Sequence, residues 1–457
     1  MEVTQRPQTA VGRARRAYPP GPRDRLLVLR SFRRDVLGFF LDLARDYGEL
    51  VHFRILGRRN DFYLVSAPET VKRILVADNA HFRKGQSMQE ARRILGDGLL
   101  SSEGDVHFRQ RRLIQPRFSS SHLADYVEKM AAPIEQADRD WRHGDERDMH
   151  REMYRLTLNV IAKTLFTSDV EALSDDMNHA ISSGMRMMSR LTLPYSNIWE
   201  HLPIPVLREM HRSSEFLRET IAELVDRRRA EDDPPDDLLT MLLQAQRDGV
   251  EGVTDQQIHD ETITLFLAGH ETTAAWFAWI LYLLHLHPEV EQRLVAELDA
   301  VLGGRTPGLD DFERLPYLEM VLTETLRLYP SVWMVVRRAN GDYDLDGYPI
   351  DSRSVVLMPP WVIHRDPRWY PDPLRFDPER WTPEERAKRP RYSFFPFGGG
   401  PRLCVGEGFA WYETRMGVAV LLQRWKFRLC PDQEVVPAPL LSLRPRTGMR
   451  MRLEARA

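Results

Sequence analysis

Cys404 follows a glycine-rich, proline-containing loop, in the run Phe-Gly-Gly-Gly-Pro-Arg-Leu-Cys-Val-Gly over residues 397–406. A helix-forming run comes directly after it, over residues 407–422. A thiolate at the N-terminus of a helix gains from the helix dipole and from nearby N–H groups, which lower its pKa. The glycines allow a flat partner to approach the backbone, and Phe397 can shield the sulfur from water. These features indicate a reactive or metal-binding cysteine.

This loop has two other possible interpretations. A lone cysteine near a loop is most often a buried structural residue. A glycine-rich phosphate loop is excluded, because no Gly-x-x-x-x-Gly-Lys-Ser/Thr pattern follows a strand here. The choice between a reactive and a structural cysteine therefore depends on the other motifs of the chain.

Residues 397–406 resemble the haem-binding signature of the cytochrome P-450 family, Phe-x-x-Gly-x-Arg-x-Cys-x-Gly, at every fixed position. The resemblance implies haem b as the cofactor, with Cys404 as the thiolate ligand of the iron. It places Phe397, Arg402 and Gly406 beside the haem. The thiolate pushes electron density toward O–O cleavage, which argues for an oxygenase and against a haem carrier or sensor.

Residues 268–273, Ala-Gly-His-Glu-Thr-Thr, resemble the oxygen-activating segment of the same family. Ala268, Gly269 and Thr272 share one helix face, because they are spaced i, i+1 and i+4. The two small residues would let the haem and dioxygen approach the backbone. Thr272 and Glu271 are the expected catalytic residues, since an alcohol and an acid can relay the protons that O–O cleavage needs. Peroxide-driven relatives usually lack this pair, so a peroxygenase is the less favoured alternative.

Residues 104–112 resemble the helix that binds the haem propionates in this family. His107 and Arg111 are i, i+4 neighbours that can hold one carboxylate, although many members have Trp where His107 stands. The resemblance also assigns Arg337 and Arg402 to the propionates, through charge-assisted hydrogen bonds. For any single arginine, a solvated surface position is the common alternative.

The segment Glu-Thr-Leu-Arg over residues 324–327 matches the family's Glu-x-x-Arg helix, and Pro-Glu-Arg-Trp over residues 378–381 matches a later segment. The resemblance implies that Glu324, Arg327 and Arg380 form a buried ionic triad. Their expected role is structural rather than chemical.

The chain has only two cysteines, too few for an iron–sulfur cluster, and it shows no flavin module. Electrons should therefore come from a ferredoxin-type or flavodoxin-type partner with its reductase. Such partners are typically acidic, so a positive docking patch is expected near the cysteine loop. The candidates for this patch are Arg109, Arg112, Arg117, Lys388 and Arg389.

The expected substrate is a hydrophobic small molecule, which would be hydroxylated or epoxidised with dioxygen. Terpenoids, steroids, fatty acids and macrolide-like compounds all remain open. Arg58 or Arg59 could bind the carboxylate of a fatty acid, so fatty acids should be tested as substrates. The pocket candidates are mainly apolar; they are the stretches 86–100 and Gly184–Trp199, Phe266, Val332 to Val335, and Leu440–Leu441.

A long helix must position the oxygen-activating segment. Thr254 can cap its start, with Gln257 completing a capping box, and the helical pattern continues to about His287. Hairpins are expected over residues 48–66 and 439–455, and short strands from 335 to 360. The expected fold is mainly α with small β-sheets, an α+β cytochrome P-450 fold, with haem between the long central helix and the helix after the cysteine loop.

Composition is consistent with this expectation. The 457 residues carry a formal net charge of −3 and 42% hydrophobic residues, which gives no case for nucleic acid. Two cysteines exclude a disulfide framework. No apolar run suits a signal peptide or a membrane anchor, so a cytoplasmic, soluble protein is expected. The whole chain, 1–457, is expected to form one haem domain after a flexible start over residues 1–18.

Overall fold

The computed structural model describes residues 18–85, 88–89, 92, 96–168 and 205–456. Of the start that the sequence predicts to be flexible, residues 1–17 lie outside this set. Tyr18 lies within it and stacks on His52, with 4.2 Å between the ring centroids. The methionine-rich pocket candidate Gly184–Trp199 lies outside the described residues as well.

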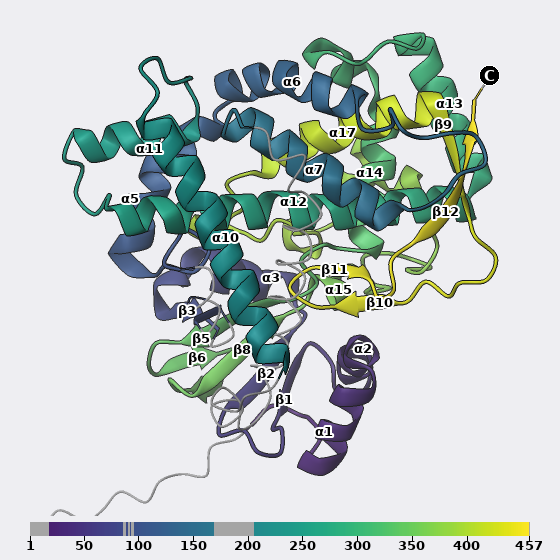
Figure 1. Cartoon of the computed structure of the whole chain (residues 1–457). Helices are drawn as coiled ribbons and strands as arrows, with labels where there is room; N and C mark the ends of the chain where they lie inside the picture. The colour runs from purple at the N-terminus through teal and green to yellow at the C-terminus, as the bar shows by residue number, and fades with distance from the viewer. Residues whose placement is uncertain (1–17, 86–87, 90–91, 93–95, 169–204, 457) are drawn as a thin grey trace, which may run out of the picture.

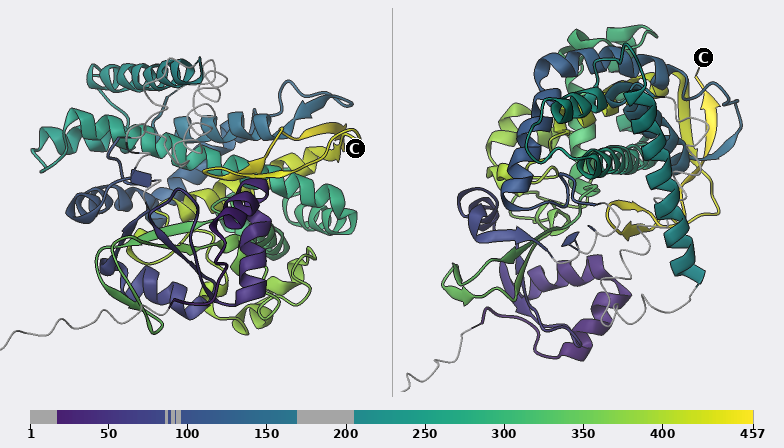
Figure 2. Two further views of the ribbon diagram at one scale, coloured as in Figure 1. Left: turned by 90° about the horizontal axis from the view of Figure 1, so that it is seen from below. Right: turned by 60° about the vertical axis from the view of Figure 1, so that its left-hand side comes forward.

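Helices dominate the described chain and fill one part of the molecule, while the largest sheet gathers with α1 and α2 at the other end (Figures 1 and 2). The α+β class with dominant helices is therefore confirmed. The longer helices are α1 (Arg25–Arg34), α2 (Val36–Tyr47), α5 (Gly104–Ile114), α6 (Ser120–Glu135), α7 (Met149–Leu165), α10 (Pro205–Arg229), α11 (Leu238–Arg247), α12 (Asp255–Leu286), α13 (Pro288–Leu302), α14 (Pro316–Leu328) and α17 (Glu407–Arg424). Shorter ones are α3 (Pro68–Lys72), α15 (Pro360–Ile363) and α16 (Pro383–Ala387).

The helix α12 has the bounds that the capping pattern predicts, and the Thr254 hydroxyl accepts a hydrogen bond from the Gln257 N–H at 3.2 Å. The second half of the expected capping box is not formed. The Gln257 side chain instead donates to the Asp97 carbonyl and to the Glu261 carboxylate. With 32 residues, α12 is roughly 48 Å long and runs through the middle of the helical part (Figure 1).

A five-stranded mixed sheet has the strand order β1-β2-β8-β5-β3. The antiparallel pair β1–β2 is the hairpin expected over residues 48–66, and β5 to β8 are the strands expected between 335 and 360. The strands of this part are β1 (Leu50–Phe53), β2 (Asp61–Val65), β3 (Phe82–Lys84), β5 (Val335–Ala339), β8 (Ser354–Met358) and the separate hairpin of β6 (Tyr343–Leu345) and β7 (Tyr348–Ile350).

The single hairpin expected over residues 439–455 is wrong. The strand β11 (Leu443–Pro445) pairs with β10 (Pro437–Pro439), whereas β12 (Arg450–Ala455) belongs to another sheet. The partners of β12 are β9 (Trp425–Leu429) and β4 (Glu146–Asp148). Because β4 lies about 300 residues earlier in the chain, the local alternation of residues could not reveal this pairing.

The helix α12 lies within the largest hydrophobic cluster, where it contacts α7, α14 and α17. Trp276 and Trp279 are fully buried in this core, and their indole N–H groups donate to the carbonyls of Leu322 at 3.1 Å and Leu443 at 2.8 Å. The acidic, proline-containing segment 231–237 connects α10 to α11. Among the described helices, none is both long and apolar enough to cross a membrane.

Candidate active site

The cysteine loop is closed by a backbone hydrogen bond, which the Cys404 N–H donates to the Phe397 carbonyl at 3.1 Å. Gly400 has a φ of 66°, a value that favours glycine. A Cβ at this position would also lie 1.9 Å from the Leu75 carbonyl oxygen. The loop leads directly into α17, whose N-cap is Gly406. The loop therefore holds the cysteine one turn before a helix, as the sequence predicts.

The Cys404 side chain keeps accessible surface, although the surrounding protein buries it from bulk solvent. The sulfur therefore borders a space inside the fold. Burial raises the pKa of the Cys404 thiol to about 11, while the Gly406 N–H and the Arg111 guanidinium oppose this effect. The lowered pKa expected from the helix N-terminus is thus outweighed by burial. A bound cation would favour the thiolate at this position, and an iron ion would deprotonate the sulfur on coordination.

One face of α12 is partly exposed within an otherwise buried stretch of the helix. Between residues 260 and 281, Ala268, Gly269 and Thr272 are the only residues that are not buried. They share a helix face, as their spacing predicts. The sequence did not show a second feature of Gly269: a Cβ there would lie 2.0 Å from Cδ1 of Ile161 in α7, so a larger residue would displace the Ile161 side chain.

Thr272 is bonded along its own helix. Its hydroxyl donates to the Ala268 carbonyl at 2.9 Å, and the Thr272 carbonyl accepts from the Ser331 hydroxyl at 2.8 Å. A hydroxyl that donates once still has lone pairs to accept hydrogen bonds. The Thr272 hydroxyl can therefore accept a hydrogen bond from a further donor on the partly exposed face of α12.

Glu271 is 1% exposed, and its carboxylate is bonded away from Thr272. The Ser442 hydroxyl donates to Glu271 Oε1 at 2.6 Å, and the Arg444 guanidinium lies 3.9 Å from the same oxygen. The other oxygen, Oε2, is buried without a hydrogen-bond partner among the described residues. The acid and the alcohol are thus sequence neighbours with separate hydrogen-bond partners.

Two residues of α7, His150 and Tyr154, form a buried polar group together with Glu271. Burial lowers the pKa of His150, and the charge of Glu271 opposes that effect. Burial raises the pKa of Tyr154, and its hydroxyl lacks a partner among the described residues. Neither residue was expected from the sequence. Both come from a helix that lies more than a hundred positions before Glu271.

His107 is 3% exposed, and only one of its two ring nitrogens has a hydrogen-bond partner among the described residues. Its Nδ1 is 3.3 Å from the Leu99 carbonyl, which can only accept, so Nδ1 carries the hydrogen. Its Nε2 is buried without a partner in the described part of the chain. Arg111 donates to the Leu403 carbonyl, which ties α5 to the cysteine loop.

Arg337 lies opposite Lys84 in the antiparallel pair of β5 and β3. Arg337 is 9% exposed and donates to the Val336 carbonyl at 3.1 Å, while the Lys84 ammonium donates to the Leu99 carbonyl at 3.2 Å. Lys84 was not expected from the sequence, because it belongs to no recognisable motif. Only the strand register places it beside Arg337.

These basic side chains form an electropositive cluster, which we define as Lys84, His107, Arg111, Arg337 and Arg402. Burial is the main reason why the pKa of Lys84 falls to about 7, that of His107 to about 3 and that of Arg337 to about 10. The charge of Arg402 lowers all three further.

Glu103 is the acid that forms an ion pair within this cluster, through Arg402. This single carboxylate cannot balance the several basic groups of the cluster, and an added anion would stabilise their charged forms. A group that carries carboxylates, such as haem with its propionates, therefore fits the cluster. The accessible sulfur of Cys404 and the open face of α12 fit the iron and the flat ring of the same group.

Glu324 and Arg327 form the buried pair that the resemblance implies. Both side chains are fully buried, and two N–H groups of Arg327 each donate to Glu324 at 2.7 Å. Arg380 lies 3.4 Å from the same carboxylate. Further N–H groups of Arg327 donate to three backbone carbonyls. These hydrogen bonds connect α14 to the chain segments that surround it.

The five residues expected to form a positive docking patch differ in their surroundings, and three of them already have partners within the protein. Arg109 and Arg112 are exposed on α5, with no ion pair to another described residue. The other three are engaged: Arg117 pairs with Asp236, Lys388 pairs with Glu385, and Arg389 packs on Tyr370 and Trp381. The partners of these three residues are nearby acids and aromatic rings, which sequence position alone does not reveal.

A sequence model of the cytochrome P450 family matches residues 19–450. Cyclooctatin synthase from Streptomyces melanosporofaciens is 37% identical over 407 residues, or 88% of each chain. Cyclooctat-9-en-7-ol 5-monooxygenase from the same organism is 35% identical, over 86% of this chain and 85% of that protein. Pentalenene oxygenase from Streptomyces avermitilis is 33% identical, over 91% and 92%. The chain belongs to the cytochrome P450 family and is an oxygenase of the oxidoreductase class.

Proposed function

We propose that this protein inserts one atom of dioxygen into a hydrophobic small molecule, with a terpenoid as the first candidate. The observation that carries the proposal is the convergence of three features on one region of the fold. These features are the accessible sulfur of Cys404, the open face of α12 and the electropositive cluster. Electrons would come from a separate ferredoxin-type or flavodoxin-type partner with its reductase.

The proposed cofactor is haem b, which would supply the site for oxygen binding and O–O cleavage. Cys404 would ligate the iron, and Lys84, His107, Arg337 and Arg402 would hold the propionates. His107 needs both ring nitrogens protonated to keep its bond to Leu99 and also donate through Nε2. An anion at Nε2 favours that form of the ring.

The residues around the cysteine loop and α12 would orient and shield this cofactor. Arg111 would hold the loop through the Leu403 carbonyl. Phe397, which contacts Trp411 with 6.2 Å between ring centroids, would keep water from the sulfur. Gly406 would direct its N–H toward the sulfur, and Ala268 and Gly269 would border the ring.

Thr272 and Glu271 would move protons for the oxygen chemistry that the bound haem would supply. The Thr272 hydroxyl is on the partly exposed face, and Glu271 has one unpartnered oxygen in a buried polar group. That group also contains His150 and Tyr154, so it can hold a proton or an ordered water near Glu271.

The candidate substrate pocket is apolar where the structure describes it. Val332 to Val335 are partly exposed, and so are Leu440 and Leu441. The Trp333 indole N–H donates to the Leu440 carbonyl at 2.8 Å, which holds the two segments together. Phe266 is buried and stacks on Phe166 with 4.3 Å between centroids, so it belongs to the core.

Two relatives support a terpenoid substrate by their names, which refer to pentalenene and cyclooctat-9-en-7-ol. An apolar pocket is suited to such molecules. We further propose that residues 1–457 form a single haem domain that acts in the cytoplasm.

The test of the haem assignment is the spectrum of the reduced, CO-bound protein. We expect the strongly red-shifted Soret band of a thiolate ligand, and its loss in Cys404→Ser. Cys430→Ser is the matched control, because Cys430 is the other cysteine of the chain and lies directly after β9, outside the cysteine loop. An unchanged band in Cys404→Ser would refute the assignment.

The substrate class is tested by spectral titration of the holoenzyme with terpenoids, steroids, fatty acids and macrolides. We expect polycyclic terpenoids to shift the haem spectrum most strongly, and turnover to require an electron donor and oxygen. A preference for fatty acids that weakens in Arg58→Ala would contradict the terpenoid proposal. Efficient turnover with peroxide alone would contradict the monooxygenase proposal.

A further inference from the structure

The helix α1 presents an unusual combination of apolar and basic side chains to solvent. Leu26 and Leu27 are 64% and 58% exposed, which is high for two adjacent leucines. Arg30, Arg33 and Arg34 are also exposed, and they lie one to two turns further along the same helix. At 100° per residue, all five fall on one broad face.

The opposite face of α1 anchors it to the protein. Val28 is 2% exposed, and Leu29 and Phe32 pack against a hydrophobic cluster that includes Phe39 and Phe40 of α2. The helix therefore has a fixed orientation. Its outward leucines and arginines are held in place and are not free to turn inward.

The charges of α1 are not neutralised locally. Residues 23–35 contain five arginines and two aspartates. Asp24 accepts hydrogen bonds from the N–H groups of Leu26 and Leu27, and Asp35 accepts one from Gly38 at the start of α2. Both aspartates serve as helix caps, which leaves the arginines without an ion pair to another described residue.

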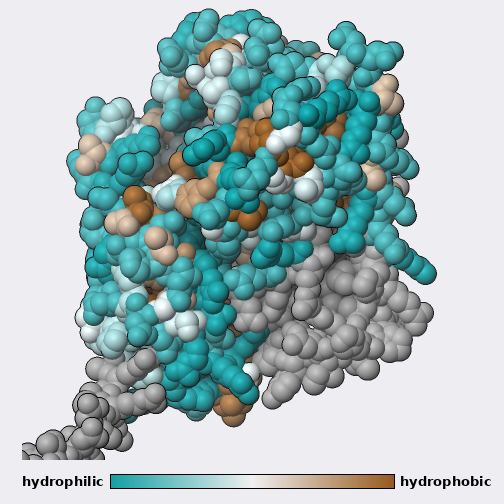
Figure 3. Space-filling view, turned by 90° about the vertical axis from the view of Figure 1, so that its left-hand side faces the viewer, coloured by the Kyte–Doolittle hydropathy of each residue, from teal (hydrophilic) through white to brown (hydrophobic). Residues whose placement is uncertain are grey.

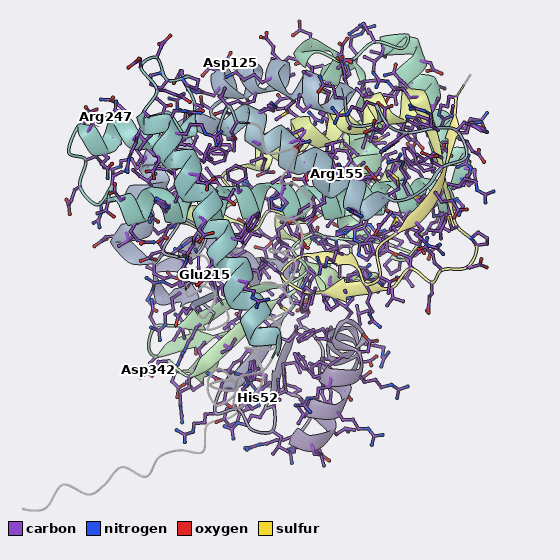
Figure 4. All side chains as sticks on the ribbon, in the orientation of Figure 1. His52, Asp125, Arg155, Glu215, Arg247 and Asp342 are labelled. Carbon is purple, nitrogen blue, oxygen red and sulfur yellow. The ribbon has the colours of Figure 1, made fainter. Side chains whose placement is uncertain are left out.

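Further apolar and basic side chains lie at the same end of the molecule. The turn between β1 and β2 carries Leu56, which is 46% exposed, and the exposed Arg59. Figures 1 and 2 show α1 and this hairpin together at the end opposite most of the helices, and Figure 4 labels His52 of β1 there.

We propose that α1 docks this protein on the surface of an anionic lipid bilayer. The leucines would enter the boundary between headgroups and acyl chains, and the arginines would contact the lipid phosphates. Exposed leucines favour an apolar medium, and the surplus arginines match a surface of opposite charge. Such docking would also bring the enzyme to the bilayer, where a hydrophobic substrate dissolves. This last consequence rests on the proposed function.

A second copy of the chain is the less suitable occupant. Two copies would bring five arginines against five arginines, which is unfavourable. Two leucines also offer far less apolar area than a stable protein interface needs. Self-association through α1 is therefore kept as an outcome of the test.

The test measures the partition of the full-length holoenzyme onto sedimented vesicles. We expect binding to phosphatidylglycerol vesicles, little binding to pure phosphatidylcholine vesicles, and weakening as salt is raised. The double variant Leu26→Asp/Leu27→Asp should lower the partition coefficient at least about tenfold. Each substitution Arg30→Gln, Arg33→Gln or Arg34→Gln should lower it roughly fivefold.

The matched control is Leu374→Asp, because Leu374 is 72% exposed outside α1 and should leave the partition unchanged. All variants should keep the CO-bound spectrum, which shows that they are folded. Equal binding to both kinds of vesicle, or unchanged binding of the double leucine variant, would overturn the proposal. A concentration-dependent dimer that is lost in the leucine variant, without vesicle binding, would assign the helix to self-association instead.

Discussion

At the scale of single residues, Thr272 combines a hydroxyl with partial exposure in a stretch of α12 that is otherwise mostly buried. Most of the polar side chains around it in α12 are buried, and two other threonines of the helix bond to carbonyls one turn earlier. The position of Thr272 on the open face is what distinguishes it. Its proposed task is to accept and pass on protons.

Thr272→Ala should leave haem bound but divert reducing equivalents to peroxide. Loss of one proton-relay group typically costs a factor of about 10² to 10⁴. The measurement is the ratio of product formed to electron donor consumed, together with the peroxide released. Thr272→Ser keeps the hydroxyl and should restore most of the coupling. An unchanged ratio in the alanine variant would contradict the proposed role.

Glu324 illustrates the opposite case, a charged residue with no access to solvent. It accepts two hydrogen bonds from Arg327, one from the Trp381 indole and one from the Asp377 backbone. Removing one partner of a buried pair leaves the other charge unsatisfied and costs about 3–5 kcal/mol. Glu324→Ala should therefore lose stability and haem, as measured by urea unfolding and by haem content.

Glu319→Ala is the control for this variant, because Glu319 lies on the same helix but is 45% exposed in its pair with Arg415. An exposed pair contributes about 0–1 kcal/mol, so this control should stay close to the parent protein. A stable, fully haem-loaded Glu324→Ala protein would show that the pair is dispensable.

At the scale of elements, the start of α12 holds the loop that precedes α5. The carboxylates of Asp260 and Glu261 accept hydrogen bonds from the N–H groups of Asp97 at 2.7 Å and Leu99 at 2.9 Å. The Leu99 carbonyl in turn faces His107. Burial raises the pKa of Glu261 to about 8, so the neutral form is favoured in the folded protein.

This shift predicts how stability depends on pH. Between the ordinary glutamate value of about 4.5 and the folded value of about 8, the unfolded chain has released the proton and the native chain retains it. The free energy of unfolding should therefore fall as pH rises through this window, by up to about 1.4 kcal/mol per pH unit. Denaturant titrations at several pH values measure the slope.

Glu261→Gln carries no charge at any pH and should flatten that part of the profile. The control Glu251→Gln changes an exposed residue just before α12 and should leave the slope as it is. Equal slopes in the parent protein and in Glu261→Gln would assign the pH dependence to other groups.

At the scale of the whole molecule, the exposed arginines Arg109 and Arg112 lie beside Phe108, which is 55% exposed. Their helix, α5, is tied to the cysteine loop through Arg111. Figure 3 shows the side of the molecule where α5 and α11 lie in Figure 1, and this face is largely hydrophilic with smaller apolar areas. An exposed aromatic residue beside arginines is a suitable centre for a protein interface.

We predict that an acidic electron donor docks on this part of α5. Arg109→Glu with Arg112→Glu should slow the first electron transfer at low salt, and the difference should shrink as salt is raised. Stopped-flow reduction measures the effect, and substrate binding should be unchanged. Lys388→Glu is the control, because Lys388 is already paired with Glu385. Unchanged reduction kinetics in the double variant would place the docking face elsewhere.

Several features of this protein are determined by short stretches of sequence. The loop at residues 397–406 has its glycines, its cysteine and its following helix within about twenty-five positions, and all of them act locally. The same holds for the start of α12 at Thr254 and for the shared face of Ala268, Gly269 and Thr272. Helix periodicity and capping depend on neighbours in sequence, so these elements and the α+β class could be predicted.

Other features depend on contacts between distant segments, and only the tertiary structure decides them. Lys84 joins the electropositive cluster because β3 pairs with β5, about 250 residues later. Glu271 receives its partners from β11 and its surroundings from α7. Burial changes the pKa of Cys404 in the direction opposite to that expected from its helix. Strand register, burial and ion pairing are properties of the packed molecule, and no local pattern of residues contains them.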